Sequence, residues 1–328
     1  MSNFWQRMMH PEWYHGRQWP PPFFEGWYYK LVDAAREHPL AVIPGVFLSQ
    51  EPHAFVQVLD GRDARATYHR YPLDQFQAAE DALEIQVGPN YFSANEIKLA
   101  IADAERPLHG EVSFSGLTPW PVTPLAPGIM GWYAWVPFME CYHGIVSLDH
   151  QLSGALTLGQ ERLNFTGGRG YIEKDWGSAF PEGYVWLQTN HFSQPGTSLT
   201  GSIAIIPWLG RAFRGFIIGF WHEQQLYRLA TYTGARVESL AISDDHVDWV
   251  VSDRRVRLVM RATRTAGGLL KGPTTQDMGQ RVAETLTATV AVQFWRRERP
   301  RDRLLFEDTG YNAGLEVHGN LARLLKMR

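Results

Sequence analysis

Three adjacent ionisable side chains stand in an otherwise apolar stretch at residues 170–177, which reads Gly-Tyr-Ile-Glu-Lys-Asp-Trp-Gly. In an extended strand successive side chains point to opposite sides, so Tyr171, Glu173 and Asp175 share one face, and Lys174 and Trp176 share the other. Burying such groups is costly unless they are paired. The run is therefore either an exposed ionic cluster at the rim of a barrel or a group held in place for chemistry.

A second group of candidate residues lies at 137–150 and contains Glu140, Cys141, His143 and His150. These types include acids, bases and metal ligands. His143 and His150 are an odd number of residues apart, however, so on an unbroken strand they face opposite ways. No His-Glu-x-x-His or comparable spacing is present, and we expect no metal site. A single cysteine near a histidine is common by chance, and we expect no thiol nucleophile.

Other recognisable catalytic motifs are missing from the sequence. The glycines at 167–170 are not followed by Gly-Lys-Ser/Thr, so they do not form a phosphate loop, and no Gly-x-Ser-x-Gly elbow occurs. The net charge of −3 gives no long-range attraction to nucleic acid or to an anionic membrane. We expect no nucleic-acid partner and at most peripheral membrane contact.

The lone Cys141 rules out an internal disulfide and a thiolate zinc cluster. The first residues lack an apolar signal core, and no window approaches 18 uncharged apolar residues. These features predict a cytoplasmic protein.

Strand signals dominate the elements that must position these residues. Short β-branched and aromatic runs alternate with Gly, Pro, Asp and Asn, and no helical period is sustained. The expected strands are 41–47, 55–59, 83–87, 97–101, 111–114, 185–192, 202–206, 216–220, 247–251, 256–260 and 287–295. Many short, closely spaced strands predict an all-β barrel or sandwich.

Weak internal matches in a shared order indicate a duplication. Residues 24–29 resemble 181–186, 83–87 resemble 247–251, and 97–101 resemble 256–260, all at offsets near 160. Later matches have offsets near 141, so the first half carries extra residues, a Pro/Trp-rich insertion at 118–144. We interpret it as a flap over a ligand cavity or as a packed inter-domain linker. The expected domains are an N-terminal extension at 1–19, a first barrel at 20–178 and a second barrel at 179–328.

Four motifs resemble those of the tocopherol cyclase family. They are Phe24-Glu25-Gly26-Trp27, Glu173-Lys174-x-Trp176-Gly177, Pro181-x-x-Tyr184-x-Trp186-x-Gln188-x-Asn190-x-Phe192 and Ala313-x-x-Glu316-Val317. The resemblance implies two lipocalin-like antiparallel β-barrel domains, akin to the carotenoid hydratase group. It also implies cyclisation of a prenylated benzoquinol to a chromanol without a cofactor. The chain looks like a divergent, bacterial-type member, because Asp175 stands where the plant and cyanobacterial proteins carry Asn.

Such a cyclisation needs a protonated carboxylic acid, which Asp175 or Glu173 could provide when buried in an apolar site. Trp176 or Trp186 could stabilise the developing cation. Lys174 or His143 could orient the phenol, with Glu140 nearby. The expected ligand is a small hydrophobic isoprenoid or quinol, bound by residues rich in aromatic rings: Trp27, Tyr171, Trp186, Gln188, Asn190, Trp132 and Trp135. A non-catalytic isoprenoid- or quinone-binding protein and an isoprenoid hydratase are the alternatives.

Overall fold

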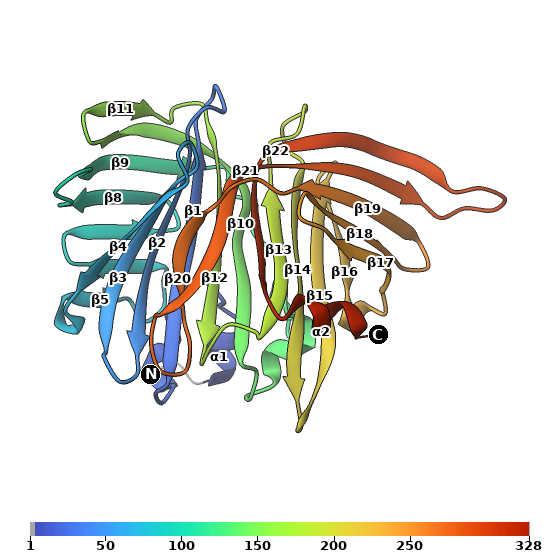
Figure 1. Cartoon of the computed structure of the whole chain (residues 1–328), viewed down its shortest axis with the longest axis horizontal. Helices are drawn as coiled ribbons and strands as arrows, with labels where there is room; N and C mark the ends of the chain where they lie inside the picture. Colours follow the sequence, from blue (N-terminus) through green and yellow to red (C-terminus); the bar gives the residue numbers. More distant parts are fainter. Residues whose placement is uncertain (1–3, 328) are drawn as a thin grey trace. The chain divides into compact units, whose positions relative to one another are not determined.

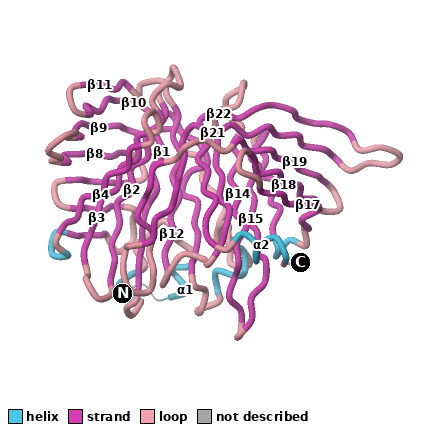
Figure 2. Tube along the Cα trace, viewed as in Figure 1, coloured by secondary structure: helices cyan, strands magenta, loops and turns pink. Residues whose placement is uncertain are grey.

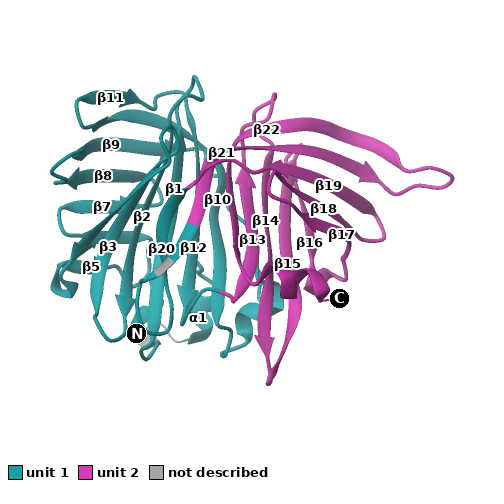
Figure 3. Ribbon diagram, viewed as in Figure 1, with its two compact units in different colours: residues 1–180, 268–282 teal, residues 181–267, 283–328 magenta. Residues whose placement is uncertain are grey.

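The computed structural model describes residues 4–327 and consists almost entirely of β-strands (Figures 1 and 2). The chain forms two compact units (Figure 3): unit 1 comprises residues 1–180 and 268–282, and unit 2 comprises residues 181–267 and 283–328. The predicted all-β class is confirmed, with one large antiparallel sheet in place of each predicted barrel. Within the described residues, no helix has the length and apolar character needed to cross a membrane.

Unit 1 contains the whole of a 12-stranded sheet in the order β4-β3-β2-β1-β12-β10-β9-β8-β7-β6-β5, with β11 paired to β10. The strands are β1 (Phe23–Val32), β2 (Pro39–Leu48), β3 (His53–Asp60), β4 (Arg65–Tyr71), β5 (Phe76–Ala78), β6 (Glu84–Val87), β7 (Asn90–Ser93), β8 (Glu96–Ile101), β9 (Leu108–Ser115), β10 (Cys141–Leu158), β11 (Glu161–Asn164) and β12 (Arg169–Gly177). The helical elements are α1 (Phe4–Met8) and the 3-10 turns η1 (Gly16–Gln18), η2 (Leu73–Gln75) and η3 (Gly131–Trp135). Strand β20 (Gly268–Gly272) lies against β3 and β4.

The unit 1 sheet rolls around the side chains of one face. Tyr29 of β1 contacts Phe92 of β7 and Phe114 of β9, with ring centroids 5.8 and 6.0 Å apart, although these strands are distant in the sheet order. We call this face, which carries Tyr29, the concave face. The sheet nevertheless ends at β4 and β5, which are not paired with each other among the described residues. It is therefore an open, lipocalin-like sheet rather than a closed barrel.

Unit 2 has a sheet in the order β16-β15-β14-β13-β22-β21-β19-β18-β17. Its elements are β13 (Gly183–Thr189), β14 (Ser198–Trp208), β15 (Arg211–His222), β16 (Gln225–Ala230), η4 (Thr231–Thr233), β17 (Arg236–Ile242), β18 (His246–Ser252), β19 (Val256–Thr263), β21 (Gln280–Arg296), β22 (Arg303–Gly319) and α2 (Leu321–Lys326). One face packs into an apolar core that includes Val185, Leu187 and Trp249. Alternation of buried and partly exposed residues along β19 shows why these short runs form strands with one face in the core.

The two sheets repeat one strand order, which supports the predicted duplication. In this order β1 and β12 take the places of β13 and β22. On one side of these central pairs β2, β3 and β4 correspond to β14, β15 and β16. On the other side β10, β9, β8 and β7 correspond to β21, β19, β18 and β17, with β20 left out. By this order β18 corresponds to β8 and β19 to β9. The sequence matches of 83–87 with 247–251 and of 97–101 with 256–260 are therefore wrong, because they pair β18 with β6 and β19 with β8. Unit 1 has the additional strands β5 and β6, which displace the repeat.

Residues 118–140 of the predicted insertion form an irregular connection between β9 and β10 that contains η3, whereas residues 141–144 are already the start of β10. Its prolines explain the lack of strands, since proline removes a backbone donor. Trp120 and Ala134 are buried, and Trp135 packs against Trp5 of α1 with ring centroids 5.1 Å apart. The segment is thus ordered against the N-terminal residues; its role as a flap stays a prediction.

Candidate active site

Strand β12 lies between β1 and β10, and its side chains divide as the sequence predicts. Asp175 pairs with Gly26 and His143, and Glu173 pairs with Tyr28 and Ile145. Directly paired residues of antiparallel strands lie on the same face of a sheet. Tyr171, Glu173, Asp175 and His143 therefore share the face opposite the concave one, which we call the convex face. Lys174 and Trp176 share the concave face with Trp27.

The convex face holds a compact group of polar side chains, which we call the His143 cluster: His143, Glu173, Asp175 and Tyr171. Nδ1 of His143 lies 2.7 Å from Oδ1 of Asp175, and its Nε2 lies 3.5 Å from Oε2 of Glu173. The hydroxyl of Tyr171 donates to the same Glu173 oxygen at 2.5 Å. One imidazole thus bridges two carboxyl groups, and a phenol fixes one of them. His150, by contrast, contacts Phe114 on the concave face, because the two register shifts in β10 between Ile145 and His150 cancel.

The imidazole of His143 carries a proton at neutral pH. Burial favours the neutral ring, but the carboxylates of Asp175 and Glu173 outweigh burial and raise the pKa of His143 to about 9. The side chain of Glu173 is 5% exposed and that of Asp175 is 28% exposed. Asp175 is therefore the carboxyl that a ligand can reach more easily.

The same groups are close enough to ligate a small cation, because one ligand atom from each of His143, Glu173 and Asp175 lies within 4.8 Å of the others. As arranged here, the two ring nitrogens face one carboxylate each, which is the geometry of a hydrogen-bonded ionic cluster. Neighbouring Cys141 is not activated: burial, aided by Asp175, Glu140 and Glu173, raises the pKa of its thiol. Glu140 is half-buried beside it.

Lys174 lies apart from this cluster, in an ionic network on the concave face. Its Nζ is 2.6 Å from Oε1 of Glu25 and 2.7 Å from Nδ1 of His15, and it donates to the carbonyl oxygen of Trp13. Glu25 also accepts from the backbone amides of His15 and Gly16 at 2.9–3.1 Å. The side chains of Lys174, Glu25 and His15 are fully buried. This network ties the N-terminal segment to β12 and β1.

Tryptophan rings enclose the Lys174 ammonium. Nζ lies 4.6 Å from the ring centroid of Trp176 and 5.1 Å from that of Trp27. Trp176 also stacks on His15 and on Tyr142, with centroids 4.3 and 5.4 Å apart. Burial lowers the pKa of Lys174 to about 8, although Glu25 acts in the opposite direction. The ring faces of Trp176 are thus already occupied by protein groups.

The predicted ligand-binding residues fall in three places. Trp27 belongs to the Lys174 network, and Tyr171 belongs to the His143 cluster. Trp132, 45% exposed, and Trp135, which donates to the carbonyl oxygen of Pro124 at 3.0 Å, lie in η3. Trp186, Gln188 and Asn190 lie in and just after β13 of unit 2, and all three are buried.

Trp186 and Gln188 lie on a face of unit 2 that also carries a residue which the sequence does not identify as a candidate. They lie on the face of β13 opposite the apolar core residues Val185 and Leu187. On the same face, Glu316 stands opposite Trp186 and opposite the fully buried Glu284 of β21. The sequence does not single out Glu284, because no motif surrounds it. It also does not identify Glu25 and His15 as partners of Lys174, although Glu25 stands in the Phe-Glu-Gly-Trp motif.

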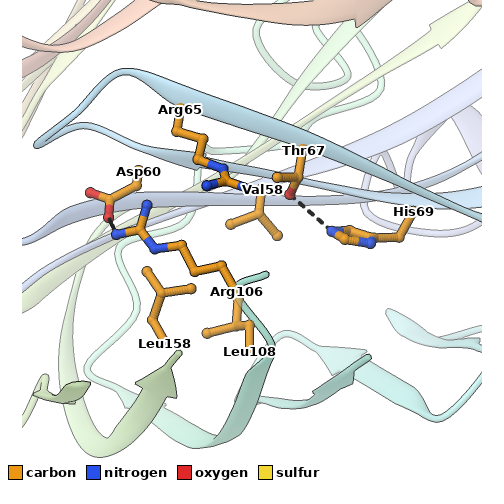
Figure 4. A pocket seen from close by; sticks show the side chains of 8 residues that line it. All are labelled: Val58, Asp60, Arg65, Thr67, His69, Arg106, Leu108 and Leu158. Atoms are coloured by element: carbon orange, nitrogen blue, oxygen red, sulfur yellow. Dashed lines mark hydrogen bonds and ion pairs between the residues drawn. The ribbon is translucent and has the colours of Figure 1, made fainter. Parts of the chain in front are cut away.

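A small pocket on the concave face of unit 1 is distinct from the His143 cluster (Figure 4). Val58, Thr67 and His69 line one side of it, and Leu108 and Leu158 line the other. Nε2 of His69 is 2.9 Å from the Thr67 hydroxyl. The remaining lining residues, Asp60, Arg65 and Arg106, belong to an ion-pair network near the sheet ends. The pocket does not connect these groups to the candidate acids.

The fold consists of two open antiparallel sheets that share one strand order, and each sheet packs its core against one face. This architecture is that of a lipocalin-like β-protein, and β12 and β10 add an acid–imidazole cluster to it. The chain belongs to the tocopherol cyclase-like family, whose model matches residues 111–319. It is 26% identical over 204 residues to a chloroplastic tocopherol cyclase of Zea mays, an alignment that covers 58% of this chain and 41% of the relative. The chain therefore matches less than half the length of that relative.

Solved structures share the fold at low sequence identity. The crystal structure of CghA with Sch210972 has a TM-score of 0.58 and 9% identity, covering 91% of this chain and 89% of that one. Kievitone hydratase from Nectria haematococca has a TM-score of 0.50 and 10% identity, covering 90% and 89%. These similarities support the architecture alone.

Proposed function

We propose that the protein is a cofactor-independent cyclase that converts a prenylated benzoquinol, or a similar isoprenoid, to a chromanol. Membership of the tocopherol cyclase-like family supports a reaction of this type. The observation that carries the proposal is the His143 cluster, because it places two carboxyl groups and a protonated imidazole within one small volume. A protein that only binds and carries an isoprenoid does not need a group of side chains that can donate a proton.

The proposed reaction starts with transfer of a proton from the Asp175 carboxyl to the less substituted carbon of the prenyl alkene. The π electrons form the new C–H bond and leave a tertiary cation. A lone pair of the phenol oxygen forms the C–O bond, and the phenolic proton returns to the carboxylate of Asp175. Atoms and electrons balance within one substrate molecule, so the reaction is an isomerisation.

His143 has the second role in this proposal. Its imidazolium donates to Asp175 and so holds the carboxylate that forms when the proton leaves. Glu173, held by Tyr171, keeps the imidazolium charged and is the fallback acid. Lys174 is not assigned to the phenol, because its ammonium is committed to Glu25, His15 and Trp13 on the other face.

Exclusion of water decides between cyclisation and hydration of the cation. The 118–144 segment is the proposed flap, and its exposed Leu125, Trp132 and Phe138 are apolar surface for an isoprenoid tail. Trp186, Gln188 and Asn190 stay proposed ligand-binding residues. A prenyl tail of four units supplies on the order of 10 kcal/mol of apolar burial before ordering costs, so no ionic clamp is needed.

The test is incubation of the purified protein with prenylated benzoquinols, with the product identified by mass spectrometry in H₂¹⁸O. We expect a chromanol of unchanged mass. We expect Asp175→Asn to lower turnover by about 10²- to 10⁴-fold, the usual contribution of a positioned acid. The matched control is Glu111→Gln, which removes an exposed carboxyl from β9 and should keep full turnover.

Three results separate the alternatives. A product heavier by H₂¹⁸O would mean that the protein is a hydratase. Binding of the quinol without any product would mean that it is a carrier. Full turnover by both Asp175→Asn and Glu173→Gln would show that the acid lies elsewhere.

A further inference from the structure

Unit 2 carries a concentrated positive charge at one end of its sheet, which we call the arginine patch: residues 236–238, 252–257 and 295–304. These segments contain nine arginines and four carboxylates and so have a net charge of +5. Since the whole chain has a net charge of −3, the remaining residues together carry −8. The small total charge therefore hides a strong separation of charge along the chain.

Strand pairing brings the three segments of the arginine patch together. Arg236 of β17 pairs with Ser252 of β18, and Val256 of β19 pairs with Arg296 of β21. The amide of Arg297 donates to the carbonyl oxygen of Arg255 at 2.7 Å. The patch is thus the shared end of neighbouring hairpins, and the long β21–β22 hairpin forms its tip (Figure 1).

Most of these guanidinium groups are exposed and are not neutralised. Arg257 pairs with Glu238 at 2.7 Å, and Arg303 pairs with Glu298 at 3.5 Å. Arg297 donates to Ser252 and to the backbone of Asp253. Among the residues that the structure describes, six exposed arginines of the patch have neither an ion pair nor a side-chain hydrogen bond: Arg236, Arg254, Arg255, Arg296, Arg299 and Arg301.

We propose that the arginine patch docks the protein on an anionic lipid surface. Clustered arginines at a projecting end match the negative charge of a phospholipid leaflet. Leu304, which is 39% exposed, and Pro300 stand beside the arginines and offer apolar atoms to the headgroup region. The choice of a membrane over nucleic acid rests on the proposed function, because an isoprenoid substrate is dissolved in a bilayer.

The test is co-sedimentation of the full chain with phosphatidylcholine vesicles that contain or lack about 30% phosphatidylglycerol, at low and high salt. No substrate is present, so docking and catalysis can fail separately. We expect binding only to the anionic vesicles and its loss at high salt, because salt screens exposed charges. Each arginine near such a surface contributes about fivefold, so Arg299→Gln with Arg301→Gln should weaken binding roughly thirtyfold.

The matched control is Arg211→Gln with Arg228→Gln, two exposed arginines of unit 2 outside the patch, which should bind like the unchanged protein. Equal binding to both kinds of vesicle, or equal losses in the two double variants, would overturn the proposal. A labelled DNA duplex is measured in parallel. Tight duplex binding without vesicle binding would assign the patch to nucleic acid instead.

Discussion

The protonation of His143 gives the sharpest check on the candidate site. Its pKa in the folded protein is about 9, against an ordinary value of 6.5, because Asp175 and Glu173 outweigh burial. A difference of about 2.5 pKa units corresponds to about 3 kcal/mol of folding free energy. The folded state holds the proton more tightly than the unfolded state. This stabilisation is therefore complete below pH 6.5 and is lost as the pH rises through about 9.

Two measurements test this reasoning. A histidine NMR titration should show one resonance with a midpoint near pH 9, which disappears in His143→Gln and persists when exposed His109 is replaced by Gln. Urea unfolding should show that His143→Gln loses much more stability at about pH 6 than at about pH 10. In Asp175→Asn the midpoint should fall, because the main carboxylate partner is gone. A midpoint at or below 6.5 in the unchanged protein would refute the ionic description of the cluster.

The buried groups of the concave face give two further predictions. Lys174→Met should lower the unfolding free energy by about 3–5 kcal/mol, because it leaves Glu25 buried without its cation, and adding Glu25→Gln should restore part of the loss in urea unfolding. Burial and Lys174 lower the pKa of His15 to about 4, and burial and Arg169 lower the pKa of His150 to about 3. At about pH 5 both imidazoles are therefore neutral in the folded protein and charged in the unfolded chain. Together they should make the free energy of unfolding rise by about 2.7 kcal/mol per pH unit near pH 5. His150→Gln should roughly halve this contribution in urea unfolding measured across that pH range. A slope that His150→Gln leaves unchanged would contradict the prediction.

The sequence predicts the division of β12 into two faces because strand alternation is a local property. It also places His143 near the strand, but not its register against Asp175. That register depends on irregularities in β10 between Ile145 and His150, where the pairing with β12 shifts. No local pattern in the sequence marks these shifts, which is why the sequence indicates only proximity and not the contact itself.

The partners of Lys174 are beyond sequence reasoning for a different reason. His15 and Trp13 lie about 160 residues away in the N-terminal segment, and long-range contacts of this kind leave no periodic signal. The internal repeat is recognisable in the sequence, but the sequence matches pair the wrong strands in the outer part of the sheet, where β18 and β19 are matched to β6 and β8. Short Val- and Leu-rich alternations fit almost any strand, so they do not reveal that β5 and β6 are extra.

The two faces of β12 differ in their ability to exchange a proton, and this difference favours the convex face for chemistry. On the concave face one ammonium and one carboxylate balance, His15 is neutral, and all three side chains are fully buried. Adding a proton there leaves an uncompensated charge in a dry interior, which is strongly opposed. On the convex face one imidazolium stands between two carboxyl groups, so with both ionised the cluster has a charge of −1 and can accept a further proton. Asp175 is also partly exposed. The Lys174 network is therefore suited to holding the strand in place, and the His143 cluster is suited to delivering the proton.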